Sequence, residues 1–95
     1  NEAFLREIIS MYAADDKRAE IQKAYDNCDW DNYRIMIHTV KSTSRTIGAM
    51  ELGDEAQTLE SAVKEQDEGR IRELHDGVME LYSAVLDWCR HNAMI

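Results

Sequence analysis

Apolar residues recur at alternating steps of three and four in three successive segments of this 95-residue chain. The spacing puts them on one side of an α-helix, because a helix turns once in 3.6 residues. The chain has no proline and only four glycines, so little interrupts long helices, whereas a sheet protein needs frequent turn residues. The three stripes are Trp30, Tyr33, Ile37, Val40, Ser44 and Ile47; Ala49, Leu52, Ala56, Leu59 and Val63; and Ile71, Leu74, Val78, Leu81, Val85 and Trp88.

Shorter apolar patterns predict two more helices before residue 30, separated by the "ADD" interruption. Their apolar positions are Phe4, Ile8 and Met11 in the first, and Ile21, Tyr25 and Cys28 in the second. Stripes of this kind form the seams of antiparallel bundles. We therefore predict an all-α fold, an up-and-down four-helix bundle with an additional short N-terminal helix, in one domain spanning residues 1–95.

The boundaries of these helices carry capping residues. Asp29 and Asp67 stand where N-caps would begin the helices that follow them. Gly48 stands where the helix from residue 30 should end, as a left-handed C-terminal glycine does. Gly53 and Gly77 fall inside predicted helices, where we expect them to be tolerated or to mark close helix–helix contacts.

Composition excludes several classes of protein. A net charge of −8 argues against nucleic-acid binding, which needs clustered cations. No apolar run approaches the length of a membrane span, and the start lacks the features of a signal peptide. The two cysteines, Cys28 and Cys89, give no disulfide framework and no metal cluster. We expect both to be buried reduced thiols in a cytoplasmic domain.

One helix face stands out because it is basic. Arg34, His38, Lys41 and Arg45 fall on the same side of the helix from residue 30, with Ser42 beside them. No acidic residue occurs from Asn32 to Met50. This row lies well away from the apolar stripe, so His38 should face solvent in the middle of an anchored helix.

Two interpretations of this face stay open on helix geometry. One is a solvated surface with an incidental histidine, since charged faces commonly solubilise helices. The other is a nucleophilic imidazole that meets an anionic group, because histidine is largely neutral near pH 7. In that case Lys41, one turn on, could hold phosphoryl oxygens, and small residues at Ser42 and Thr39 would let a partner approach closely.

The residues around His38 match a known pattern. The run His38-x-Val40-Lys41-Ser42-x-Ser44-x-x-Ile47-Gly48-Ala49 resembles the signature of histidine-containing phosphotransfer (HPt) domains, H-x-L-K-G-x-S/A-x-x-L/I-G-A. The similarity extends through "DWDNYRIMIHTVK" and "LGDEAQTLESAVKEQD", and covers roughly residues 4–90. One position departs from the pattern, because Ser42 stands where the family has a glycine that gives the incoming receiver room.

The resemblance implies a phosphorelay intermediate. His38 would accept a phosphoryl group from a receiver aspartyl-phosphate and pass it to another receiver aspartate, with Lys41 offsetting the phosphoryl charge. Arg34 and Arg45 would be docking charges, Ser42 would lie on the docking surface, and Ile35 is a candidate apolar contact, although packing against the helix after residue 15 explains it about as well.

The same resemblance predicts the partners and their setting. They would be receiver domains of response regulators or hybrid histidine kinases, and the protein would be a cytoplasmic monomer, free-standing or part of a larger sensor kinase. It implies no kinase or ATP site, no cofactor and no metal of its own, since the Mg²⁺ lies in the receiver.

Three other interpretations concern the remaining histidines, a di-iron site and a receiver-binding adaptor. We expect His75 and His91 to be exposed on the last helix and to form no site. A di-iron bundle needs Glu-x-x-His pairs, whereas the residues three before the histidines are Ile35, Arg72 and Trp88. The alternative that remains is a helical adaptor that binds receivers without being phosphorylated.

Overall fold

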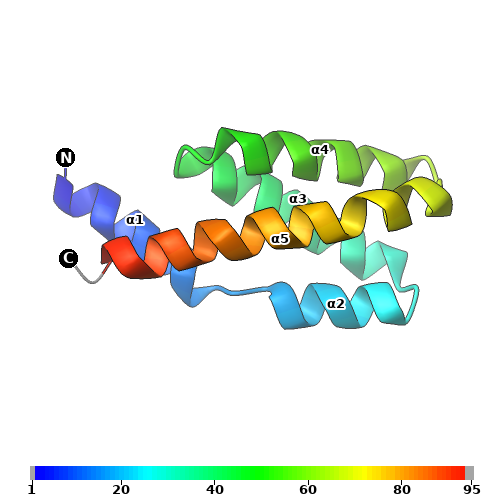
Figure 1. Cartoon of the computed structure of the whole chain (residues 1–95), viewed down its shortest axis with the longest axis horizontal. Helices are drawn as coiled ribbons and strands as arrows, with labels where there is room; N and C mark the ends of the chain where they lie inside the picture. Colours follow the sequence, from blue (N-terminus) through cyan, green and yellow to red (C-terminus); the bar gives the residue numbers. More distant parts are fainter. Residues whose placement is uncertain (1, 94–95) are drawn as a thin grey trace.

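The computed structural model describes residues 2–93, and it is all-helical within that range (Figure 1). The helices are α1 (Glu2–Ala14), α2 (Arg18–Asp26), α3 (Trp30–Thr46), α4 (Met50–Lys64) and α5 (Glu68–Ala93). No helix in this part of the chain is long and apolar enough to cross a membrane.

The helices pack as an elongated bundle of 41 × 21 × 18 Å. α4 packs against both α3 and α5, α2 packs against α3, and α1 packs against α5. Figure 1 shows α1 beside the C-terminal part of α5, at the end of the bundle away from the α2–α3 turn. The predicted all-helical bundle is confirmed.

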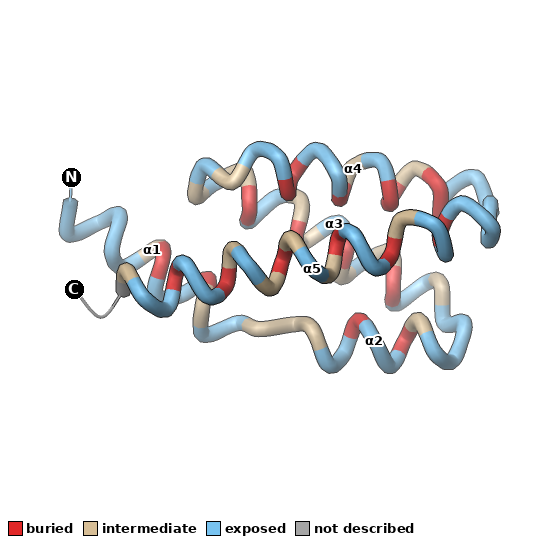
Figure 2. Tube along the Cα trace, viewed as in Figure 1, coloured by how far each residue is buried: buried red, intermediate tan, exposed pale blue. Residues whose placement is uncertain are grey.

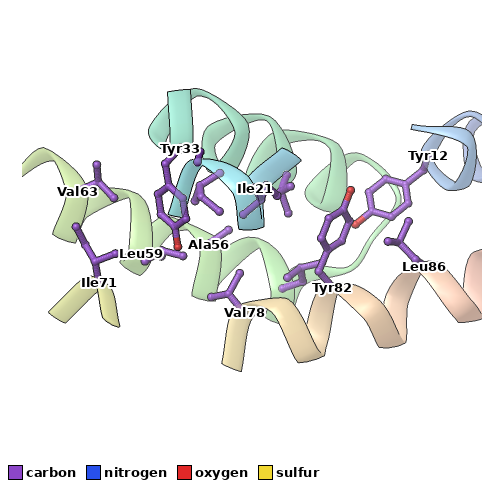
Figure 3. Close-up of a cluster of buried hydrophobic side chains, with 14 of the residues drawn as sticks. Tyr12, Ile21, Tyr33, Ala56, Leu59, Val63, Ile71, Val78, Tyr82 and Leu86 are labelled. Carbon is purple, nitrogen blue, oxygen red and sulfur yellow. The ribbon is translucent and has the colours of Figure 1, made fainter. Parts of the chain in front are cut away.

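The inward helix faces form one continuous core. Figure 2 shows the buried positions repeating along the sides on which the helices face one another. The predicted stripes of α3 and α4 are buried or partly buried along their whole length. In Figure 3 the rings of Tyr12 and Tyr82 meet at one end of the core, with their centroids 6.1 Å apart, and Tyr33 lies near the other end.

The predicted apolar face of α1 is off by about one position, whereas that of α5 is wrong only at Trp88. On α1 the buried residues are Ile9 and Tyr12, while Phe4 and Met11 are exposed. On α5 the exposed Trp88 is outside the core. The buried residues there are Ile71, His75, Val78, Tyr82, Leu86 and Cys89. The predicted Leu74, Leu81 and Val85 are partly buried against the core. The buried face also includes His75 and Tyr82, whose polar side chains find hydrogen-bond partners that an apolar count does not register.

Three of the turns end a helix in the same way. Gly48, Cys28 and Gln66 have φ of 86°, 54° and 58°. After each, the next backbone N–H returns to the preceding helix, as from Ala49 to the Ser44 carbonyl at 2.8 Å, which is the Schellman arrangement. The left-handed Gly48 is thus confirmed. The prediction of a buried Cys28 is wrong, because this turn residue is exposed, whereas Cys89 is buried as predicted.

The capping predictions agree with the structure. The Asp29 carboxylate accepts from the backbone N–H of Asn32 at 3.4 Å, and that of Asp67 accepts from Arg70 at 3.1 Å. Gly53 is a close contact, because a Cβ there would lie 2.6 Å from Arg45 Cγ, whereas a Cβ at Gly77 would have nothing within 4 Å.

Candidate functional site

His38 lies in the middle of α3, where the helix is held on its inner side. Its neighbours Ile37 and Val40 are buried in the core, while the His38 side chain is 54% exposed. Tyr12 of α1 and Ser44 of α3 share a buried hydrogen bond of 2.9 Å two turns further on. The prediction that His38 faces solvent from an anchored helix is therefore confirmed.

The imidazole is oriented by an acid from the neighbouring helix. His38 Nδ1 lies 2.9 Å from Oε2 of Glu60 on α4. The Glu60 side chain is only 1% exposed, although charged residues are rarely buried without partners. The fold therefore holds the Glu60 carboxylate in a fixed place next to His38.

Glu60 is surrounded by positive charge. Lys41 Nζ donates to its Oε1 at 2.7 Å, and Lys64 Nζ lies 3.5 Å from its Oε2. Burial alone would raise the pKa of Glu60, but the hydrogen bonds from Lys41 and His38 and their charges lower this pKa to about 2. Glu60 is thus a carboxylate at neutral pH.

The charge on Glu60 decides the tautomer of His38. A carboxylate can only accept hydrogen bonds, so Nδ1 must carry the proton that it donates to Glu60. In the neutral ring the lone pair then lies on Nε2. No residue within 2–93 hydrogen-bonds Nε2. In that form the ring turns an unprotonated Nε2 toward solvent, and such a nitrogen can act as a nucleophile.

The other predicted site residues lie around this histidine and differ in their exposure and in their partners. Lys41 is 13% exposed, because its ammonium is engaged by Glu60. Arg45 is half-buried and pairs with Asp54 of α4 at 3.1 Å. Ser42 is exposed and Arg34 is partly buried.

For Ile35 the sequence allows either a docking contact or packing against α2. It is exposed, and with Met36 it borders a shallow groove between α3 and α2. It is therefore available on the surface and is not a core contact to α2.

Glu60 and Lys64 are the site residues that the sequence analysis missed. A signal for Glu60 was present, since it follows Ala56 by four residues and precedes Val63 by three on the buried face of α4. An acid on an apolar face needs a cationic partner, and that requirement points to Lys41 across the helix pair. Lys64 then lies one turn from Glu60 on the same helix.

The expectation that His75 is exposed is wrong. Its ring is buried and stacks on Tyr25, with the ring centroids 3.7 Å apart. Nδ1 lies 2.7 Å from Tyr33 Oη and Nε2 lies 3.0 Å from Gln22 Oε1. Burial lowers the pKa of His75. It links α2, α3 and α5, whereas His91 is exposed as predicted.

Within residues 2–93, no three or more histidine, cysteine, aspartate or glutamate side chains gather where they could hold a metal ion.

Comparison with protein families gives one match. The family model described as "Hpt domain" matches residues 11–88, which include all of α2, α3 and α4 and most of α5. Comparisons with curated proteins and with solved structures gave no match.

Proposed function

Because the chain belongs to the Hpt domain family and so takes part in two-component phosphorelay, we propose that His38 is its phosphorylated residue. In this proposal His38 accepts a phosphoryl group from a receiver aspartyl-phosphate and passes it to the aspartate of another receiver. The observation that carries the proposal is the pairing of an exposed Nε2 with an Nδ1 held by the buried carboxylate of Glu60, at 2.9 Å.

The transfer follows from the tautomer of His38. Nε2 attacks the phosphorus, the N–P bond forms as the acyl P–O bond breaks, and the receiver carboxylate leaves with the bonding electrons. Nδ1 keeps its proton throughout, so the ring becomes cationic next to Glu60, which stabilises it. Onward transfer is the reverse displacement, with a second receiver carboxylate as the nucleophile.

Lys41 contributes positive charge beside the reacting nitrogen. Its ammonium has three N–H donors, and one of them serves Glu60 at 2.7 Å. The others can face phosphoryl oxygens, which gather negative charge during transfer. Lys41 thus orients Glu60 and lowers the energy of the transferring group.

The surface around His38 is where we propose that receivers dock. Arg34 and Arg45 offer positive charge to the acidic pocket of a receiver, while Ile35 adds apolar area. Ser42 is exposed one turn from His38 and is small enough to leave the approach open.

The wider description of the protein belongs to the same proposal. We infer that α2 to α5 are the four antiparallel helices of an up-and-down bundle and that α1 is the additional helix. We further infer that residues 1–95 are a single monomeric, cytoplasmic domain that uses no cofactor of its own.

The test is incubation with a panel of phosphorylated receiver domains, followed by mass analysis of acid-labile phosphate. The wild-type chain should take up one phosphoryl group, and His38→Gln should take up none while keeping its helical circular dichroism spectrum. Labelling of His75 or His91 would overturn the assignment. Receiver binding without any uptake would identify the protein as an adaptor instead.

A further inference from the structure

Lys64 shares one carboxylate oxygen with the imidazole of His38. Its Nζ lies 3.5 Å from Glu60 Oε2, the oxygen that His38 Nδ1 contacts at 2.9 Å. Lys41 instead contacts the other oxygen, Oε1. Lys64 is therefore the second ammonium at this carboxylate, and it lies on the oxygen that faces His38. It comes from α4, whereas Lys41 and His38 come from α3.

The two lysines differ in their freedom to move. The Lys41 side chain is 13% exposed and its Nζ is 2.7 Å from Glu60. The Lys64 side chain is 57% exposed and its contact is the longest of the three to Glu60. If Lys64 moves away, Glu60 keeps its two shorter hydrogen bonds. A lysine has a flexible four-carbon stem and a compact charge, so Lys64 can reorient with little effect on the buried carboxylate.

Lys64 shares its surroundings with a second cation. Lys64 and Arg34 line the same groove between α3, α4 and the start of α5, together with the acids Asp31 and Glu68. Arg34 precedes His38 by one helical turn. Lys41 follows it by nearly one turn, so two cations of α3 flank His38 along the helix, while Lys64 comes from α4.

We infer that Lys64 is a second phosphoryl-contacting cation of this site, which leaves Glu60 Oε2 and binds a phosphoryl oxygen once His38 Nε2 carries the group. The inference rests on the proposed function and assigns a further residue to it. Transfer to Nε2 puts close to two negative charges beside the imidazole, and this attracts the most mobile neighbouring cation. The charge of Glu60 is meanwhile balanced by Lys41 and the cationic ring.

The test is a ³¹P NMR titration of the phosphohistidine, formed with phosphoramidate as a small phosphoryl donor. The signal that is missing in His38→Gln identifies the group on His38. A nearby cation favours the doubly ionised phosphoryl group, so Lys64→Gln should raise the pKa of its second ionisation by about half a pH unit. Lys64→Arg should restore the wild-type value. Lys23→Gln, which removes an exposed lysine of α2, is the matched control and should leave the value unchanged.

The outcomes separate this inference from the proposed function. A His38 signal that titrates identically in wild type and Lys64→Gln would overturn the role of Lys64 and leave the phosphohistidine assignment intact. An equal shift in Lys23→Gln would also overturn it, because the effect would then be one of net charge. Failure of the wild-type chain to form any His38 signal, with phosphoramidate or with phosphorylated receivers, would overturn both.

Discussion

Replacing Glu60 by glutamine should destabilise the fold and impair phosphoryl acceptance together. Glutamine keeps the size of the side chain but removes the charge that Lys41 and His38 contact at 2.7 and 2.9 Å. It also removes the fixed acceptor that holds the proton on Nδ1, since an amide can donate as well as accept. The ring proton could then lie on Nε2 instead of Nδ1, and Nε2 would have no lone pair with which to attack.

The size of the stability effect follows from the pKa of Glu60. A fall from 4.5 to about 2 corresponds to roughly 3 kcal/mol of stabilisation at neutral pH. Glutamine can still accept one hydrogen bond, so we expect a loss of about 2–3 kcal/mol. For a domain of this size that is a decrease in Tm of roughly 10–20 °C.

The pH dependence of this loss has a definite sign. Because the pKa of Glu60 is lowered by folding, its contribution is complete above pH 4.5 and disappears as the pH falls toward about 2. The difference in unfolding free energy between wild type and Glu60→Gln should shrink across that window.

Urea unfolding followed by circular dichroism, repeated from pH 7 down to the acid limit of the fold, measures this difference. Glu55→Gln is the matched control, because Glu55 is an exposed acid of the same helix, and it should change stability by less than about 0.5 kcal/mol. If Glu60→Gln were as stable as Glu55→Gln at pH 7, the role given to the buried carboxylate would be refuted.

Four further predictions concern other parts of the molecule. Burial lowers the pKa of His75, so as the pH falls this histidine takes up a proton in the unfolded chain before it does so in the folded chain. The free energy of unfolding should therefore fall as the pH drops below about 6.5, and it should fall less in His75→Gln. Urea titrations at a series of pH values measure this difference. Gln66→Gly should raise stability by up to about 1 kcal/mol, because residue 66 has a φ of 58°, which glycine adopts without strain. Gly53→Ala should lower Tm, because the added Cβ would force the Arg45 side chain aside. Thermal melts check both. Ser42→Trp should leave Tm nearly unchanged yet weaken receiver binding in a calorimetric titration, and normal affinity would place the docking surface elsewhere.

The sequence predicted best what depends on local spacing. The stripes of α3 and α4, the caps at Asp29 and Asp67 and the left-handed Gly48 all depend on residues within one or two turns, and all agree with the structure. The orientation of His38 followed from the same reasoning, because an anchored stripe fixes the opposite face of the helix.

What the sequence did not reveal depends on contacts between helices. His75 is buried because Tyr33 and Gln22, on two other helices, satisfy both of its nitrogens at 2.7 and 3.0 Å. Glu60 is buried for a similar reason, and its two closest partners, Lys41 and His38, lie 19 and 22 residues away. The buried face of α5 is wider than the predicted stripe, because Tyr82, Leu86 and Cys89 are buried beside Leu81 and Val85, while Trp88 is exposed.

The most direct test of the central claim is to identify which nitrogen of which histidine carries the phosphoryl group. Chain labelled with ¹⁵N in its histidine rings would be phosphorylated by a receiver and its ring nitrogens observed by NMR. The account predicts one phosphohistidine, at His38, with phosphorus bonded to Nε2 and a proton on Nδ1 hydrogen-bonded to Glu60. Phosphorus on Nδ1 of His38, or on any other histidine, would contradict it.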